Sequence, residues 1–305
     1  MNAAEYLEDP VNEIVSSPRK LSAKLEEYAV VMREKIKSRI IKTSHDGIGI
    51  FIGDIHGDLE TLKKILRRVD LASLEAGDTM MVFLGDYIDR GPEQLESLIT
   101  VLELWALYPE NVVMLRGNHE PLAGVSPYPH DFPRELIDRF GYEAGNDLYS
   151  KARDLFDRLP FVALINSNLV AVHGGLPTST YMKTDKIEEY LLGERDGNFD
   201  VLVELLWNDP IDEPLVRMPS PRGAGYLWGT ALTDWVKSAF GIKLVVRGHE
   251  PAELGYKFNH GGSVLTLFSR LGPPYFNQAA AIAVFDFSSE EWMSKIPSYI
   301  QFINY

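Results

Sequence analysis

The sequence predicts an α/β fold with a layered core that contains parallel strands. Three short apolar runs have the length of buried strands, at residues 47–52, 79–84 and 111–116. Apolar residues with helical spacing follow the first two runs, over 59–69 and 92–107. Strands that alternate with helices in this way are typical of β-α-β units, in which the strands run parallel.

The first forty residues show a different pattern. Ser17 and Pro18 resemble the start of a helix, with proline at the first helical position. Apolar residues then recur every three or four positions, at Leu21, Leu25, Tyr28, Met32, Ile36 and Ile40. We therefore expect an amphipathic helix in an N-terminal helical extension over 1–42, packed against one larger domain over 43–305. Binding of a partner or a membrane is the alternative use of such a helix.

The second half of the chain is less regular. Two apolar runs flank the polar tripeptide at 166–168 and predict a β-hairpin, whereas proline, glycine and charged residues over 208–225 predict a long loop. The remaining predicted elements are helices over 147–159 and 230–240 and strands over 242–246, 263–268 and 280–287.

The composition narrows the class of protein. The formal net charge of −14 disfavours sequence-independent binding to nucleic acid, which depends on basic side chains. The absence of cysteine excludes disulfides and thiolate chemistry and fits a reducing compartment. The acidic N-terminus lacks the apolar region of a signal peptide, and no apolar run has the length of a membrane span. We expect a cytoplasmic protein with neither a nucleic acid nor a membrane as partner.

Five predicted strands end directly in polar turns that contain glycine: GDIHG, GDYIDRG, GNHE, HGG and RGHE. Any one of them is explained by the ordinary turn preference of glycine, aspartate and asparagine. Ligands bind at the carboxyl ends of strands in α/β sheets, so five such turns together favour a site. If the strands are neighbours, the turns bring together Asp54, His56, Asp86, Asp89, Arg90, Asn118, His119, His173 and His249.

These residue types suit divalent transition metals such as Mn, Fe or Zn. Asp54 and His56 are two residues apart, so in an extended segment both side chains point the same way. Two divalent ions held by two aspartates and by neutral ligands keep an excess of positive charge that attracts a phosphate dianion. A pair of ions also lowers the pKa of a bound water and supplies hydroxide as the nucleophile for phosphoryl transfer to water.

The order and spacing of these motifs resemble the PPP family of metal-dependent serine/threonine protein phosphatases, within the calcineurin-like metallophosphoesterase superfamily. The resemblance covers roughly residues 45–290 and includes WNDP at 207–210. GDxHG alone indicates only the superfamily, whereas Asp89-Arg90 and WNDP favour the narrower family. The resemblance implies an α/β (α+β) metallophosphoesterase fold, with a central β-sandwich flanked by helices instead of a single parallel sheet. Residues 43–305 would form the catalytic domain.

The resemblance also implies two divalent metal ions, Mn first, with Fe, Zn, Co and Ni as alternatives. Asp54, His56 and Asp86 would hold one metal, and Asp86, Asn118, His173 and His249 the other, so that Asp86 bridges them.

Phosphate binding and proton transfer are assigned by the same resemblance. The oxygens of the phosphate would be bound by Arg90, Asn118, Arg222 and Tyr275. His119 would protonate the leaving alkoxide, and Asp89 would orient its ring. The substrates would be phosphoserine or phosphothreonine proteins or peptides, and no regulatory subunit is identified.

Three positions depart from the family pattern. Asn208 stands in WNDP where the family usually has serine. Arg222 lies in a loop whose preceding residues do not match, so a solvated loop charge is its alternative reading. SRLGPPYFN at 269–277 replaces the family's SAPNYC and lacks its cysteine, so that covalent attachment of toxin inhibitors through that cysteine is impossible here. Tyr275 is a candidate for the family's tyrosine beside the cleft.

Two other functions compete with a phosphoprotein phosphatase. The first is a hydrolase of dinucleoside polyphosphates or nucleotides, which would use the same metal ligands. The second is a scaffold that binds phosphoproteins without turnover, which the presence of every proposed ligand and of His119 disfavours.

Overall fold

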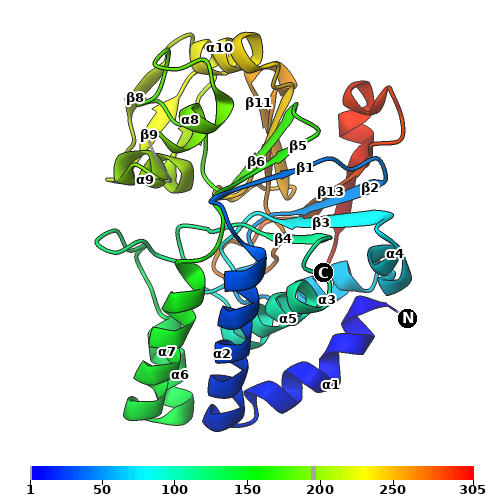
Figure 1. Ribbon diagram of the computed structural model, residues 1–305, viewed down its shortest axis with the longest axis vertical. Coiled ribbons are helices and arrows are strands. Elements are labelled where there is room, and N and C mark those ends of the chain that lie inside the picture. Colours follow the sequence, from blue (N-terminus) through cyan, green and yellow to red (C-terminus); the bar gives the residue numbers. More distant parts are fainter. Residues whose placement is uncertain (1, 194–196) are drawn as a thin grey trace.

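A computed structural model describes residues 2–193 and 197–305 of the chain. Two β-sheets pack face to face, and helices cover both outer faces (Figure 1). In spatial order, the five-stranded sheet contains β14 (Ile300–Ile303), β13 (Ala280–Asp286), β2 (Ile48–Ile52), β3 (Thr79–Phe83) and β4 (Val112–Met114). The six-stranded sheet contains β1 (Ile40–Thr43), β5 (Val162–Ile165), β6 (Leu169–Val172), β10 (Leu244–Arg247), β12 (Val264–Leu267) and β11 (Tyr256–Asn259).

This arrangement confirms the sandwich that the family resemblance implies and corrects the single parallel sheet. Strands β2, β3 and β4 are parallel, as the β-α-β pattern predicts. However, β13 runs antiparallel to β2, and the hairpin of β5 and β6 pairs with β1 and β10 in the other sheet. The strands of the second half therefore form a sheet of their own instead of extending the first.

Side chains that point alternately to the two faces of each strand fill three apolar layers. In β2, the side chain of Phe51 packs between the sheets, whereas Ile50 and Ile52 pack against the helices on the outer face. In β3, Met80 and Val82 repeat the inward pattern. This period of two is what a strand buried on both faces requires.

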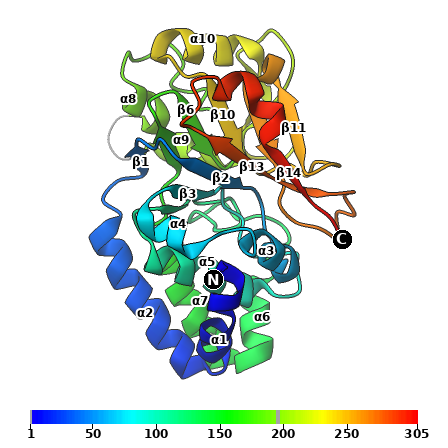
Figure 2. The same ribbon diagram turned by 90° about the vertical axis from the view of Figure 1, so that its right-hand side faces the viewer.

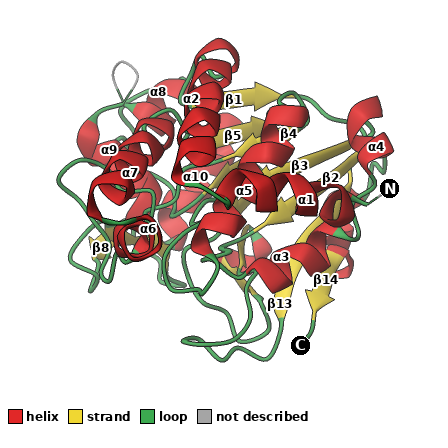
Figure 3. Cartoon of the chain, turned by 90° about the horizontal axis from the view of Figure 1, so that it is seen from below, coloured by secondary structure: helices red, strands yellow, loops and turns green. Residues whose placement is uncertain are grey.

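The helices form the two outer layers (Figure 2). The layer on the five-stranded sheet contains α1 (Ala3–Val15), α2 (Pro18–Lys35), α3 (Leu59–Leu66), α4 (Leu71–Ala76), α5 (Gln94–Leu107), α6 (Phe132–Phe140) and α7 (Tyr142–Phe156). Figure 3 shows several of these helices in front of the strands. The layer on the six-stranded sheet contains α8 (Ile187–Leu192), α9 (Phe199–Trp207) and α10 (Thr230–Phe240). Within the described ranges, none of the helices combines the length and apolarity that crossing a bilayer requires.

Residues 208–225 form more structure than the predicted long loop. Strands β7 (Asp209–Pro210) and β8 (Arg217–Pro219) lie in this range and form a three-stranded sheet with β9 (Tyr226–Trp228), which follows it and lies between them. Strand β8 is exposed, so its residues carry no apolar pattern from which a strand could be predicted.

The N-terminal extension packs against the body of the protein. Helix α2 begins at the predicted Ser17-Pro18 and buries Leu21, Leu25, Tyr28 and Met32, and the Tyr28 hydroxyl bonds the Glu103 carboxylate at 2.5 Å.

The predicted continuation of this helix to Ile40 is wrong. Ile36 is extended and ends the helix, and Ile40 opens the edge strand β1. The predicted boundary between the N-terminal extension and the catalytic domain, between residues 42 and 43, falls within β1. This division of the chain stays a prediction.

Candidate metal and phosphate site

The five polar turns converge, but they come from two sheets. The turns at 53–57, 85–91 and 117–120 follow β2, β3 and β4, and those that begin at His173 and Gly248 follow β6 and β10. A bridge between Asp54 and Phe268 joins the ends of β2 and β12 and holds the two sheets together here. The predicted convergence is therefore confirmed at an edge that both sheets share.

Several site residues adopt the left-handed backbone conformation that favours glycine. The φ angles are 45° at His56, 57° at Asp86, 65° at Asp89, 76° at Arg90 and 69° at His249. Such conformations are uncommon for residues with a side chain and often mark functional sites. The prediction of an extended segment from Asp54 to His56 is therefore wrong, because the chain turns at His56. The His56 ring and the Asp54 carboxylate nevertheless lie close together.

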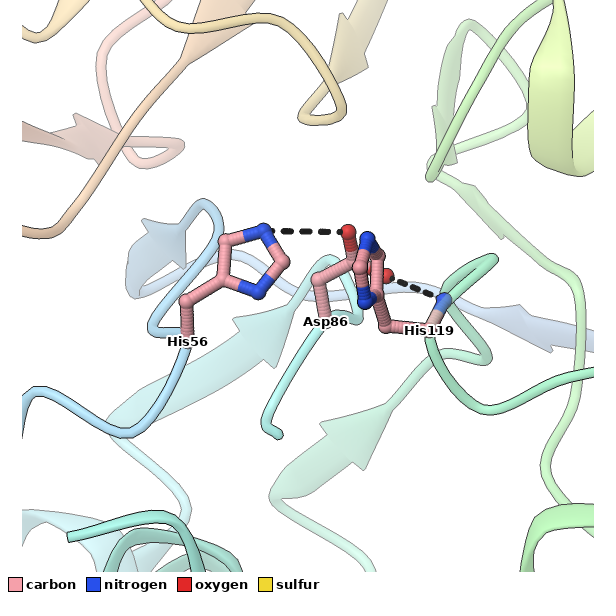
Figure 4. Close-up of side chains that lie close together, drawn as sticks. All are labelled: His56, Asp86 and His119. Carbon is pink, nitrogen blue, oxygen red and sulfur yellow. Dashed lines mark hydrogen bonds and ion pairs between the residues drawn. The ribbon is translucent and has the colours of Figure 1, made fainter. Parts of the chain in front are cut away.

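Asp86 lies at the centre of the site. Its Oδ2 is 3.4 Å from His56 Nε2, and its Oδ1 is 3.4 Å from His173 Nε2. The same Oδ1 accepts the backbone N–H of His119 at 2.9 Å, and Figure 4 shows Asp86 between His56 and His119. The carboxylate thus presents one oxygen to each half of the site.

Two groups of potential metal ligands share this carboxylate. Within each group, one ligand atom per residue lies within 4.8 Å of the others, and the groups are His56–Asp86–His119 and Asp86–His173–His249. Asp54 lies beside the first group, with Oδ2 3.7 Å from His56 Nε2. Asn118 lies within the second, because its Oδ1 is 2.9 Å from both His173 Nε2 and His249 Nδ1.

Hydrogen bonds on the far side of each ring select the nitrogen that faces the site. His56 Nδ1 donates to the Ile88 carbonyl at 2.8 Å, and His173 Nδ1 donates to the Leu84 carbonyl at 2.9 Å. Their Nε2 atoms then carry no proton and can bind a metal. For His249 the roles are reversed, because Nδ1 faces Asn118 while Nε2 has no hydrogen-bond partner among the described residues.

Burial determines the charges in the site. It raises the pKa of Asp54 to about 7 and raises the pKa of Asp86 well above its usual range. Burial also lowers the pKa of His56, His173 and His249 well below the ordinary value, so the rings are neutral. Neutral imidazoles beside buried carboxylates that need a positive partner are a donor set for divalent transition metals. The residues present therefore fit the two ions.

Asp89 lies beside His119 rather than among these ligands. Its Oδ2 accepts Nδ1–H of His119 at 2.6 Å. Burial opposes ionisation of Asp89, but hydrogen bonds from His119 and His130 outweigh it and lower the pKa of the carboxyl. An ionised Asp89 fixes the His119 ring through Nδ1 and leaves Nε2 outside this contact.

The predicted phosphate-binding residues surround the same site. Arg90 uses Nη2 on the Tyr128 carbonyl at 3.1 Å, while its buried Nε has no partner among the described residues. Arg222 Nε donates to Asp209 Oδ2 at 2.6 Å, so it is an ion-paired residue and not a freely solvated loop charge. The ring of Tyr275 stacks on His56 with centroids 5.9 Å apart.

The departures from the family pattern have structural roles. The Asn208 amide donates to the Leu176 carbonyl at 2.8 Å, and its oxygen accepts the Tyr226 N–H at 2.6 Å. In the loop after Ser269, buried Arg270 donates to the His56 carbonyl at 3.1 Å, and its guanidinium lies 5.2 Å from the Tyr275 ring centroid. Arg270 thus fastens this loop to the metal-binding turn.

Two residues of the site carried no predicted role. Glu120 holds the turn of Asp86 by hydrogen bonds, and its membership of GNHE was the available signal. His130 contacts Asp89 from the loop between β4 and α6, and no local motif marks it.

Comparison with known proteins gives the family. The profile of the calcineurin-like phosphoesterase family matches residues 50–253. A probable serine/threonine-protein phosphatase of Encephalitozoon cuniculi is 32% identical over 230 residues, which are 75% of this chain and 48% of that protein. The chain thus spans about half the length of this curated relative.

Solved structures share the fold. A protein serine/threonine phosphatase from Saccharomyces cerevisiae matches with a TM-score of 0.69 at 23% identity, over 91% of this chain and 88% of that one. A cold-active protein-tyrosine phosphatase of a psychrophilic Shewanella matches with a TM-score of 0.55 at 18% identity, over 84% of this chain and 79% of that one. Because the family profile covers more than half of the sequence, and the relatives support the PPP resemblance, this chain belongs to the calcineurin-like phosphoesterase family.

Proposed function

We propose that this protein is a metal-dependent phosphatase that removes phosphate from phosphoserine and phosphothreonine in proteins or peptides, with Mn²⁺ as its preferred ion. The observation that carries the proposal is that two groups of potential metal ligands share Asp86. Beside them lies His119, whose ring is oriented by Asp89. This arrangement suits hydrolysis of a phosphate ester, in which one group activates water and another protonates the leaving oxygen.

Each half of the site has a chemical task. Asp54, His56, Asn118, His173 and His249 would hold two divalent ions with Asp86 between them. When bound, the ions would activate the attacking water and stabilise charge on the phosphoryl oxygens.

The remaining residues act on the substrate itself. Because Asp89 occupies Nδ1 of His119, Nε2 is the atom that would carry a proton to the leaving alkoxide. Arg90 Nε–H, which has no partner within the described part of the chain, would donate to a phosphate oxygen, and Arg222 would add a second guanidinium.

The test compares substrates at a defined metal content. Purified protein is stripped with a chelator, reloaded with Mn²⁺, and assayed on a phosphoserine peptide and on diadenosine tetraphosphate. We expect activity only after reloading, with the higher kcat/KM on the peptide. A higher kcat/KM on the dinucleotide would favour the nucleotide hydrolase, and metal-loaded protein without turnover on either would favour the scaffold.

Asp86→Asn tests the shared carboxylate. It should lower both the bound metal, measured by elemental analysis, and kcat by at least about 100-fold, because an amide is a weak bridging ligand. Exposed Asp78→Asn is the matched control and should keep both. An Asp86→Asn protein with full metal content and activity would refute the two-metal assignment.

A further inference from the structure

Asp89 binds a second histidine that the mechanism above does not use. His130 Nδ1 lies 2.7 Å from the same Asp89 Oδ2 that bonds His119. The Asp89 side chain is fully buried, and the His130 side chain is 13% exposed. This contact is therefore an ordered part of the site and not a surface ion pair.

Hydrogen bonds connect the two histidines through Asp89. An ionised carboxylate only accepts hydrogen bonds, so both His119 and His130 donate from Nδ1 to Asp89. The Nε2 of His130 lies 2.6 Å from the Tyr149 hydroxyl. Hydrogen bonds thus connect Tyr149, His130, Asp89 and His119 in a line.

The neighbours of His130 hold the other oxygen of the same carboxylate. Asp89 Oδ1 accepts the backbone N–H groups of Asp131 and Phe132, both at 2.9 Å. The three consecutive residues 130–132 therefore bind both oxygens of Asp89. Phe132 begins α6, and Tyr149 lies in α7, so two packed helices support these hydrogen bonds to Asp89.

We propose that His130 is a positioning residue for phosphate-ester hydrolysis, which with Tyr149 behind it holds the Asp89 carboxylate in the orientation that aims His119 at the leaving oxygen. This inference rests on the proposed function, because it assigns His130 a role through the general acid. A carboxylate held on three sides cannot rotate away from His119, and the imidazole keeps the direction that proton donation needs.

Substitution of a residue that only stabilises the fold would lower the rate of hydrolysis of every substrate by a similar factor. A misoriented general acid instead slows mainly the hydrolysis of substrates with poor leaving groups, because their alkoxide must be protonated as the bond to phosphorus breaks. A phosphoserine peptide releases a strongly basic alkoxide, whereas p-nitrophenyl phosphate releases a stable phenolate. The ratio of the losses in kcat on these two substrates therefore distinguishes a positioning residue from one that only stabilises the fold.

The kinetic experiment compares three variants and one control variant of the Mn²⁺-loaded protein. His130→Ala should lower kcat on the phosphoserine peptide by about 10- to 100-fold, with KM and metal content little changed, and kcat on p-nitrophenyl phosphate by less than about 3-fold. His130→Asn keeps an N–H donor towards Asp89 and should recover part of the loss, and Tyr149→Phe should show a smaller loss of the same kind. His45→Ala changes a partly buried histidine outside the site and is the control.

Equal losses on both substrates, or no loss on either, would overturn the proposal. A second measurement does not depend on activity. In zinc-loaded protein with ¹⁵N-labelled histidine, we expect protected Nδ1–H signals from His119 and His130. His130→Ala should remove one and shift the other, whereas His45→Ala should move neither. A His119 signal unchanged by His130→Ala would reject the positioning role, even if the wild-type protein hydrolyses no phosphate ester and the proposed function fails.

Discussion

Glu120 holds the turn that carries Asp86 by accepting its backbone N–H at 2.9 Å. The same Oε2 accepts the N–H of Gly117, and Oε1 accepts the N–H of Tyr87, both at 2.9 Å. Glu120 is fully buried, and burial raises the pKa of its carboxyl to about 7 although the three hydrogen bonds oppose the shift. One carboxylate thus fixes two turns of the site.

Glu120→Gln should therefore destabilise the protein and weaken metal binding together. A glutamine keeps one acceptor oxygen, but its NH₂ group must face backbone N–H donors and leaves at least one of them unsatisfied. We expect a loss of about 1–3 kcal/mol in the free energy of unfolding and of about 10- to 100-fold in Mn²⁺ affinity. Chemical denaturation and metal titration measure the two effects. Exposed Glu253→Gln is the control, and wild-type values for Glu120→Gln would contradict the supporting role.

Arg222 binds a carboxylate that also binds a buried arginine. Asp209 Oδ2 accepts Arg222 Nε at 2.6 Å, and Asp209 Oδ1 accepts Arg247 Nη2 at 2.8 Å. The ion pair orients the Arg222 guanidinium and leaves its terminal nitrogens for the proposed contact with phosphate. Arg222→Ala should raise KM for a phosphoserine peptide about 10-fold, with a smaller change in kcat, as measured by steady-state kinetics. Arg217→Ala, in the neighbouring strand β8, should have little effect. The same KM for both variants would mean that Arg222 supports only the loop and does not bind the phosphate.

The site was more predictable from sequence than the fold around it. Glycine-flanked motifs at the strand ends identify Asp86 and the other proposed ligands wherever their strands lie, because each motif is local. Apolar runs such as 47–52 identify a strand but not its partners, since both faces of either sheet are apolar. The assignment of β5, β6, β10 and β12 to a second sheet therefore depended on the family resemblance.

Other errors have equally local causes. Ile36 and Ile40 continue the helical spacing of α2 by coincidence, since the burial of Ile40 comes from strand β1. His130 could not be identified because it reaches Asp89 through a loop that has no strand or helix of its own. Contacts between distant segments leave no periodic signal in the sequence.

Tyr275 contributes its ring to the site, and its hydroxyl can be tested separately. The ring stacks on His56 and packs edge-on against Phe268, with centroids 4.9 Å apart. Tyr275→Phe should keep Mn²⁺ affinity within about 2-fold, because the ring contacts remain. Tyr275→Ala leaves a cavity beside a proposed metal ligand and should weaken metal binding by about 10-fold. Metal titration of both variants gives the comparison.

The neighbouring residue supplies the control for Tyr275. Phe276 is 73% exposed, so Phe276→Ala should leave metal affinity unchanged. A hydroxyl that binds the substrate phosphate would appear as a raised KM in Tyr275→Phe at full metal loading. If Tyr275→Ala also bound metal normally, the stacking on His56 would have no part in holding that ligand.

Glu135 should make stability fall as the pH rises. This carboxyl in α6 accepts the Leu95 N–H at the start of α5 at 3.2 Å, and burial raises its pKa from 4.5 to about 7 against the effect of that hydrogen bond. Between these values the native state holds a proton that the unfolded chain releases. The contribution of Glu135 to stability is therefore greatest below about pH 4.5 and is lost as the pH rises towards 7.

Glu135→Gln removes this titration and keeps an acceptor oxygen for Leu95. The variant should match the wild type near pH 4.5 and exceed it by about 1–3 kcal/mol at pH 8 in the free energy of unfolding. Denaturant unfolding at the two pH values measures the difference, from which the titration of all other groups cancels. Exposed Glu143→Gln, at the start of α7, should show no such dependence. A Glu135→Gln protein less stable than the wild type at pH 8 would mean that the ionised carboxylate stabilises the native state through Leu95 and Arg139, and that burial is the weaker effect.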